Sequence, residues 1–209
     1  LRIMLLNQLL VHFKIQGVRA SRSELIDRLL HRIRRPLSGD RLPKIVVFTS
    51  FTPACTEIVQ CLSNTFGEKS VASHQFGKSR DEIEANLRKF RSQPDCFILV
   101  CDPSGEEGRN LQFAEQLIHF DLPWSPNRLE QRIGRLDRIG SKMGVQSWVF
   151  AGPDLEDSPQ DAWYRLLKDG FGIFQQSIAS LQFYVDEKLP QLELALFQLV
   201  AAGLLEAIA

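Results

Sequence analysis

The chain has 209 residues, of which 44% are apolar, 24% are charged and 9% are aromatic, with no net charge at pH 7. This composition excludes a disordered or collagen-like chain and is sufficient for one globular core with an appendage. The charge is unevenly distributed, because residues 1–44 hold ten Lys/Arg against three Asp/Glu and residues 153–209 hold three against nine. A basic amino-terminal part can mark a polyanion-binding face, although solvated helix faces would give the same count.

Helical and strand-like segments alternate along most of the chain. Apolar residues at three- and four-residue steps predict helices over residues 1–14 and 22–35. Short apolar runs predict strands that are buried on both faces. The predicted strands are residues 44–50, 71–75, 97–102, 117–121 and 145–150, and the helices between them are residues 53–66, 79–91 and 126–138.

This order predicts an α/β fold with a RecA-like parallel sheet and helices on both of its faces. Ligands bind such sheets beyond the carboxyl ends of the strands. We therefore expect function in the loops that follow Ser50, Asp102 and Asp121.

The sequence changes character beyond residue 153. A polar segment, residues 155–160, precedes apolar residues that run at three- and four-residue steps from Trp163 through Phe171 and Phe174, which predicts a helical appendage. The apolar stretch 192–208 is shorter than the roughly 20 residues of a membrane-spanning helix, so no span is expected. The expected divisions are a helical lead-in over 1–42, a core over 43–153 and an appendage over 154–209.

Two site types are not expected. The four cysteines lack the two-residue spacing of zinc sites and are interpreted as reduced core thiols. Phe76-Gly77-Lys78-Ser79 resembles part of a phosphate-binding P-loop, but no glycine stands upstream at residues 72 or 73, so the pattern fails. No metal site is predicted, and since the sequence starts at Leu1 and ends within an apolar run, we expect it to be a piece of a longer protein.

Three arginines recur at every third position in residues 131–140, QRIGRLDRIG. Three helical residues advance about 300°, so Arg132, Arg135 and Arg138 share a broad face. Guanidinium groups are planar, permanently charged donors that suit phosphate oxygens, and Gly134 leaves room for a strand or phosphate. The alternative is a solvated basic face balanced by neighbouring acidic residues.

A second signal is the loop SGEEGRNL, residues 104–111, directly after a predicted apolar strand. Its two glycines can aim backbone N–H groups at an anion or let a sugar-phosphate chain pass closely. Such loops are common, so this one gains meaning only in combination with the arginine segment.

In order, KIVVFTSF (44–51), QFG (75–77) with Arg80, the glycine loop, FDLPWSP (120–126) and QRIGRLDRIG resemble the motifs of the second lobe of a superfamily 2 helicase. The variant is similar to the SNF2 family, and within it to the bacterial RapA-like branch. The resemblance covers residues 44–152 firmly and residues 163–189 weakly. It implies a RecA-like lobe that closes over ATP and Mg²⁺ held mainly by a different lobe.

The resemblance assigns nucleotide-site roles residue by residue. Arg135 and Arg138 match the arginine fingers that reach the γ-phosphate, and Gln131 matches the polar residue that opens the motif. Arg132 is expected to brace the structure instead. Gly105, Gly108 and Asn110 match the motif that couples the nucleotide and nucleic-acid sites, with Asn110 placed to meet the ribose.

Other positions match contacts to nucleic acid without sequence preference. Trp124 matches an aromatic residue placed against the duplex, although a tryptophan after Leu-Pro could simply cap the sheet. Two positions depart from the family pattern, namely Ser141 where glutamine is usual and Glu106 where many members have a second glycine. The phosphate-contacting candidates are Ser50, Gly77, Arg80 and Ser104.

The predicted function is therefore the second motor lobe of an ATP-dependent, SNF2-type translocase on double-stranded DNA, inactive without its first lobe. By resemblance the protein is expected in the bacterial cytoplasm, with RNA polymerase as a possible partner. One alternative is a lobe of a strand-separating DNA or RNA helicase. Another is a non-catalytic RecA-like interaction module.

Overall fold

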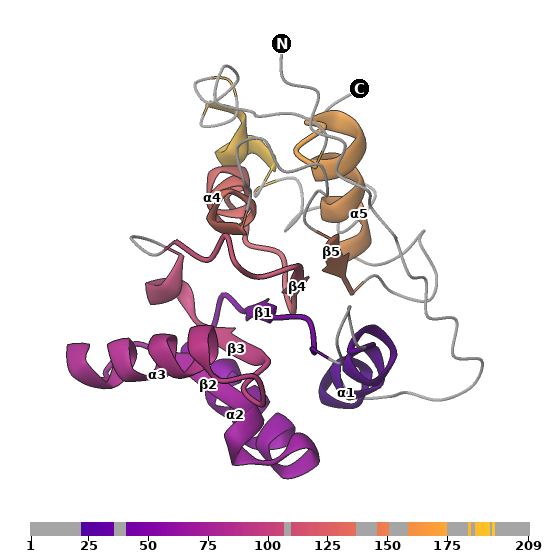
Figure 1. Ribbon diagram of the computed structural model, residues 1–209. Helices are drawn as coiled ribbons and strands as arrows, with labels where there is room; N and C mark the ends of the chain where they lie inside the picture. The colour runs from indigo at the N-terminus through magenta and orange to yellow at the C-terminus, as the bar shows by residue number, and fades with distance from the viewer. Residues whose placement is uncertain are drawn as a thin grey trace.

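The computed structural model describes residues 22–35, 41–106, 110–136, 146–150, 159–174, 184, 187–192 and 194 of the chain. Helices and strands alternate along it (Figure 1). The elements are α1 (Arg22–Ile33), β1 (Ile45–Phe48), α2 (Thr52–Phe66), β2 (Val71–His74), α3 (Arg80–Ser92), β3 (Ile98–Cys101), β4 (Gln116–His119), α4 (Pro126–Leu136), β5 (Gln146–Val149) and α5 (Pro159–Arg165), with short helical turns η1 (Glu68–Ser70), η2 (Pro103–Gly105) and η3 (Leu166–Gly170).

The five strands form one parallel sheet in the order β2-β3-β1-β4-β5. Val46 of the central strand β1 pairs with Leu99 on one side and Leu117 on the other. All four residues of each strand from β1 to β4 are buried. The strands β1 (IVVF) and β3 (ILVC) are continuous apolar runs, as burial on both faces requires, whereas β2 (VASH) and β4 (QLIH) also bury polar side chains. The predicted parallel α/β sheet is confirmed.

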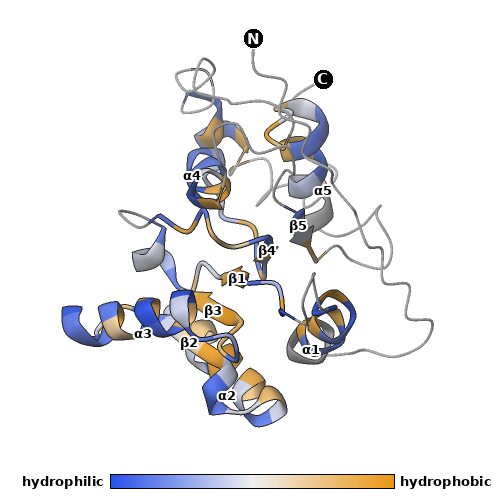
Figure 2. Cartoon of the chain, viewed as in Figure 1, coloured by the Kyte–Doolittle hydropathy of each residue, from blue (hydrophilic) through white to orange (hydrophobic). Residues whose placement is uncertain are grey.

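Helices cover both faces of the sheet, because successive strand residues point to opposite sides. Val46 and Phe48 of β1 face a cluster formed with α3, α4 and α5, whereas Ile45 and Val47 face a cluster formed with α1 and α2. Figure 2 shows β1 and β3 in hydrophobic colours, and hydrophilic colours on α3 and α4. The basic helix α1 thus contributes an apolar side to the core of the lobe.

The helix boundaries follow local sequence signals. In α3 the Ser79 hydroxyl accepts from the backbone N–H of Glu82, and the Glu82 carboxylate accepts from the backbone N–H of Ser79, which is a capping box. These contacts lower the pKa of Glu82 through its hydrogen bonds with Ser79. A proline stands in the first turn of α2, as its sequence predicts.

The appendage packs on the core but differs from its prediction. Trp163 and Leu167 belong to the same apolar cluster as α4. The continuous helix predicted through Phe171 and Phe174 is wrong, because α5 widens into the π-helical turn η3 and then ends in a non-helical turn. The backbone N–H of Phe171 bonds to the carbonyl of Leu166, and Gly172 takes a positive φ of 61°, which does not continue a helix.

Several expectations lie outside the described residues. They are the helix over 1–14, residues 155–158 of the polar linker predicted over 155–160, the last two residues of the helix predicted over 126–138 and most of the chain beyond 175. The linker prediction is wrong at residues 159 and 160, which begin α5. Within the described part, no helix has both the length and the apolar character needed to cross a membrane.

Candidate functional site

Asp102, directly after β3, ties together the carboxyl ends of three strands. Its Oδ2 accepts from the Thr52 hydroxyl and the Phe76 backbone N–H, each at 2.8 Å. Its Oδ1 accepts from the backbone N–H of Ser104 at 2.9 Å and from its hydroxyl at 2.6 Å. Burial alone would raise the pKa of Asp102, but the hydrogen bonds from Ser104, Phe76 and Thr52 outweigh it and lower the pKa. Asp102 is therefore a buried carboxylate that organises the loops.

A second carboxylate, Asp121, does the same for the loops after β1 and β4. Its Oδ1 accepts from the backbone N–H of Ser50 at 2.7 Å, and its Oδ2 accepts from the Thr49 hydroxyl. The three loops in which function was expected, after Ser50, Asp102 and Asp121, thus lie along one edge of the sheet, since all strands are parallel.

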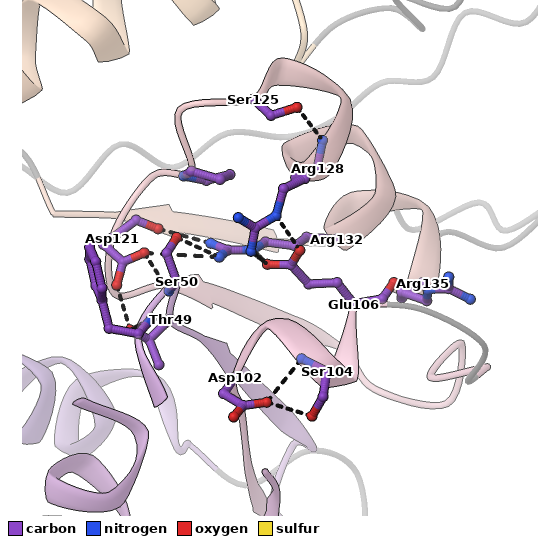
Figure 3. A network of polar contacts seen from close by, with 12 residues as sticks. Thr49, Ser50, Asp102, Ser104, Glu106, Asp121, Ser125, Arg128, Arg132 and Arg135 are labelled. Atoms are coloured by element: carbon purple, nitrogen blue, oxygen red, sulfur yellow. Dashed lines mark hydrogen bonds and ion pairs between the residues drawn. The ribbon is translucent and has the colours of Figure 1, made fainter. Parts of the chain in front are cut away.

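Arg132 of α4 is fully buried and joins α4 to this edge (Figure 3). It donates from Nη1 to the Asp121 backbone carbonyl at 2.9 Å and from Nη2 to the Ser50 hydroxyl at 3.0 Å. Its Nε donates to Glu106 at 2.7 Å. Burial lowers the pKa of Arg132, and the negative charge of Glu106 opposes that effect. Arg132 is the structural brace expected from its position, so the idea of a wholly solvated basic face does not hold for it.

Glu106 has a role that its sequence does not predict. Its carboxylate is 4% exposed and binds two arginines of α4 at once. Arg128 donates from Nε to Oε2 at 2.7 Å and from Nη2 to Oε1 at 2.9 Å, and Arg132 donates to Oε1. The available signal was the departure at position 106 together with two arginines four residues apart, which share a helix face and need an anion when buried.

Arg135, a predicted arginine finger, lies one turn beyond Arg132 and is only partly buried. Its Nε donates to the backbone carbonyl of Glu106 at 2.6 Å, and its own carbonyl accepts from the backbone N–H of Leu111 at 3.0 Å. Figure 3 shows its side chain leading away from the paired Arg128 and Arg132. On α4, Arg132 is therefore buried, whereas Arg128 and Arg135 are partly exposed, and only Arg128 and Arg132 pair with the Glu106 carboxylate.

The other predicted members of the arginine motif are placed only in part. Gln131 is exposed on α4, and Arg138 lies outside the described residues. Gly134 is also exposed, and a Cβ built on it would meet nothing within 4 Å. Nothing in the described part of this chain approaches Gly134 closely, so the room expected beside it is open.

The predicted nucleotide-coupling residues of the glycine loop differ in their surroundings. Gly105 packs tightly, since a Cβ there would lie 2.9 Å from the Cβ of Cys101 and 3.3 Å from the ring of His74. Asn110 is exposed, and its Oδ1 accepts from the backbone N–H of Gln112 at 2.9 Å. Gly108 lies outside the described residues. Their assignment to a nucleotide stays a prediction.

The predicted nucleic-acid contacts are all brought to the carboxyl edge, in or just after loops that follow four different strands. Gly77 is exposed with φ of 88°, a conformation that favours glycine. Arg80 is 85% exposed at its side chain and pairs with Glu84 at 3.3 Å. The hydroxyls of Ser50 and Ser104 already bond to Arg132 and Asp102, respectively.

Trp124 lies at the junction between the core and the appendage. Its ring centroid is 4.6 Å from that of Trp163, whose indole N–H donates to the Pro123 carbonyl at 3.0 Å. Trp124 nevertheless stays 40% exposed. Trp124 therefore packs against the appendage and also exposes part of its side chain to solvent.

The cysteines are free thiols, and burial raises the pKa of each of them. For Cys55 the pKa rises to about 12. In the described part of the chain, no three His, Cys, Asp or Glu side chains are grouped to hold a metal ion. Cys55, Cys96 and Cys101 are buried in the core, as expected, whereas Cys61 on α2 is only partly buried.

Comparisons with known proteins agree with this architecture. The family model of the helicase conserved C-terminal domain matches residues 22–140. RNA polymerase-associated protein RapA from Vibrio vulnificus (strain YJ016) is 31% identical over 172 residues, which are 82% of this chain and 17% of RapA. RapA from Sodalis glossinidius is 34% identical over 154 residues, 73% of this chain and 16% of RapA. The chain thus spans about a sixth of the length of these relatives.

Solved structures share the fold. The C-terminal part of the Fun30 ATPase domain superimposes with a TM-score of 0.57 at 18% identity, covering 83% of this chain and 53% of that one. The Sulfolobus solfataricus SWI2/SNF2 ATPase core in complex with dsDNA gives 0.52 at 24% identity, covering 78% of this chain and 32% of that one. With residues 22–140 matched by the family model and this fold shared with solved helicase and ATPase domains, the chain belongs to the helicase conserved C-terminal domain family and has its RecA-like fold.

Proposed function

We propose that this chain is the second motor lobe of an ATP-dependent translocase on double-stranded DNA, and that it supplies arginine fingers to a nucleotide held by a first lobe. The observation that carries the proposal is the different placement of two arginines on α4. Arg132 is buried in ion pairs, whereas Arg135 lies one turn further on at the rim, with its guanidinium anchored through Nε and leading away from the paired arginines.

The surroundings of Arg135 fit a phosphate ligand. Anchoring through Nε to a backbone carbonyl fixes the direction of the side chain, and a guanidinium is a planar, permanently charged donor that suits phosphate oxygens. A positioned guanidinium stabilises the charge that develops on a transferred phosphoryl group, and in trans such a residue is worth about 10³ to 10⁵ in rate. Arg138 follows at the same spacing and is proposed as the second finger, with Gln131 beside them.

ATP with Mg²⁺ is the proposed nucleotide, held mainly by the first lobe. The sequence of this chain contains no P-loop pattern, so the phosphate cradle has to come from elsewhere. Gly105, Gly108 and Asn110 are proposed to line the near side of the nucleotide. It follows that this lobe alone does not hydrolyse ATP.

Double-stranded DNA is proposed to run along the carboxyl edge of the sheet. Ser50, Gly77, Arg80, Ser104 and Trp124 come from loops or a helix start at that edge and offer hydroxyls, a glycine backbone, a cation and an aromatic ring. Such groups contact the sugar-phosphate backbone and do not read bases, which suits movement along any sequence. The Sulfolobus SWI2/SNF2 ATPase core, which shares this fold, was solved in complex with dsDNA, and this supports the choice of ligand.

RNA polymerase is a proposed partner, since the RapA relatives are named as associated with it. A partnership with DNA and RNA polymerase would place the protein in the bacterial cytoplasm. This proposal concerns the longer protein, because the chain covers only 17% of RapA from Vibrio vulnificus.

The test is ATP hydrolysis by a protein that carries both lobes, with and without duplex DNA. We expect DNA to stimulate hydrolysis, no hydrolysis by the 209-residue chain, and no displacement of a strand from a duplex. Strand displacement would favour the helicase alternative. Absence of hydrolysis with intact phosphate-binding residues in the first lobe would favour a non-catalytic interaction module.

A further inference from the structure

We propose that Glu106 is a positioning residue for Arg135 and that Arg128 is the latch that holds Glu106 in place. The proposal rests on the proposed function in one respect, namely that Arg135 acts on a nucleotide. Its structural half concerns this chain alone: the direction of the Arg135 side chain depends on the ion pair between Glu106 and Arg128.

The side chain of Glu106 is fixed at both carboxylate oxygens. Arg128 takes both oxygens in a bidentate pair, at 2.7 and 2.9 Å, while Arg132 takes Oε1 at 2.7 Å. Charge-assisted, bidentate pairs constrain geometry more tightly than single hydrogen bonds. With its carboxylate held at three points, residue 106 has little freedom to shift relative to α4.

The main chain of Glu106 carries that constraint to Arg135. The Glu106 carbonyl accepts from the Nε of Arg135 at 2.6 Å, and the Arg135 carbonyl accepts from the backbone N–H of Leu111 at 3.0 Å. Arg135 is therefore bonded to Glu106 and Leu111, which lie on either side of residues 107–109 in the sequence. Movement of Glu106 would move the acceptor that aims the Arg135 guanidinium.

Arg128 and Arg132 differ in what their removal would do. Arg132 is 0% exposed at its side chain and also binds Asp121 and Ser50, so its loss would leave several buried groups unpaired. Arg128 is 38% exposed, so water can replace part of what it leaves. Arg128 can therefore be changed while the brace of Arg132 on Glu106 stays intact.

The first experiment uses the ¹⁵Nε resonance of Arg135 in the 209-residue chain, identified by its loss in Arg135→Lys. Arg128→Met and Glu106→Gln are expected to shift this resonance towards that of a solvated arginine. Arg128→Lys, which keeps the charge but not the bidentate fork, is expected to restore it in part. Arg88→Met is the matched control. Arg88 lies on α3, its side chain is 71% exposed, and its Nη1 is 3.8 Å from Oε2 of Glu84.

The second experiment measures DNA-stimulated ATP hydrolysis in a protein that carries both lobes. Arg128→Met is expected to lower kcat about tenfold, because a misdirected finger loses transition-state contact, with KM for ATP changed by less than about twofold. Arg128→Lys should recover part of the kcat, and Arg88→Met should equal the wild type. If Arg128→Met does not fold, Arg128→Lys supplies the same comparison.

The outcomes separate the two proposals. An Arg135 resonance that neither Arg128→Met nor Glu106→Gln moves overturns the positioning role, whatever the turnover. A shifted resonance with unchanged kcat also overturns it, since Arg135 would then act without being positioned. Normal turnover in Arg135→Ala contradicts the proposed function instead, and the resonance still decides whether Arg128 and Glu106 direct Arg135.

Discussion

The Nε of Arg135 donates to the backbone carbonyl of Glu106 at 2.6 Å, although 29 positions separate the two residues in sequence. This contact links the glycine loop after β3 to α4, and so links the proposed coupling motif to the proposed finger. In the proposed motor, this link would connect the proposed nucleic-acid edge to the proposed nucleotide site through a single residue.

Replacement of Asp102 by Asn should destabilise the chain by about 2 kcal/mol. The Asp102 carboxylate accepts four hydrogen bonds, and an amide would turn a donor towards the Thr52 hydroxyl and the Phe76 N–H or towards Ser104. The measurement is the free energy of unfolding from urea denaturation. Asp95→Asn, on an exposed residue, is the control and should change it little, and an equal loss in both would contradict the organising role of Asp102.

Two glycines should respond in opposite directions to alanine. Gly105→Ala should lower the free energy of unfolding by about 1 to 3 kcal/mol, because its Cβ would press on Cys101 and His74. Gly134→Ala should raise it by about 0.5 to 1 kcal/mol, because Gly134 is helical, exposed and has open space at its Cβ. Thermal and urea unfolding would check both signs. A stabilised Gly105→Ala variant would refute the tight packing of η2.

The chain should lose stability in mildly acidic solution because of His119. Burial, followed by the charge of Arg132, lowers the pKa of this imidazole well below 6.5, and neither ring nitrogen has a hydrogen-bond partner among the described residues. Below about pH 6.5 the unfolded chain binds a proton that the folded chain does not, so the free energy of unfolding falls by up to about 1.4 kcal/mol per pH unit.

The check for His119 is the free energy of unfolding between about pH 7.5 and 5. His119→Leu should have a smaller slope than the wild type over this interval, and it should be at least as stable at neutral pH because no buried nitrogen is left unpaired. Equal slopes in the two proteins would contradict a buried, neutral His119.

Trp124→Ala should weaken the binding of duplex DNA about tenfold in a protein with both lobes, which corresponds to about 1.4 kcal/mol. Trp124→Phe should retain both the aromatic surface and most of the contact with Trp163. Fluorescence anisotropy of a labelled duplex measures the affinity, with Tyr184→Ala as an exposed aromatic control. Unchanged affinity in Trp124→Ala would leave Trp124 with only its packing role.

The sheet could be predicted because its strands are buried on both faces. Residues such as Val46 and Val47 point to opposite helical layers, so both must be apolar, and the run is visible without any partner. The starts of α2 and α3 could also be predicted from the sequence, since a first-turn proline in α2 and the pair Ser79 and Glu82 in α3 act locally. The turn after α5 could not be predicted from the sequence. A π-helical turn followed by a tight turn preserves nearly the same apolar spacing as a continuous helix.

The candidate site could be predicted from the sequence only in part. The spacing of Arg132 and Arg135 predicted both on one helix, and the family resemblance distinguished Arg132 as a brace from Arg135 as a proposed finger. Glu106 could not be found in this way, because its partners Arg128 and Arg132 lie 22 and 26 positions away and are brought to it only by the packing of α4 on the β3 loop. The role of a buried charge depends on its tertiary contacts, which cannot be seen in a single sequence.

The sharpest test of the proposed motor function is steady-state ATP hydrolysis by the two-lobed protein carrying Arg135→Ala, at saturating duplex DNA and beside the control Arg88→Ala. We predict a loss of kcat of about 10³-fold or more for Arg135→Ala, with nucleotide affinity within a few fold of the wild type and the control unchanged. Turnover by Arg135→Ala within about twofold of the wild type would contradict the claim that this lobe supplies the finger.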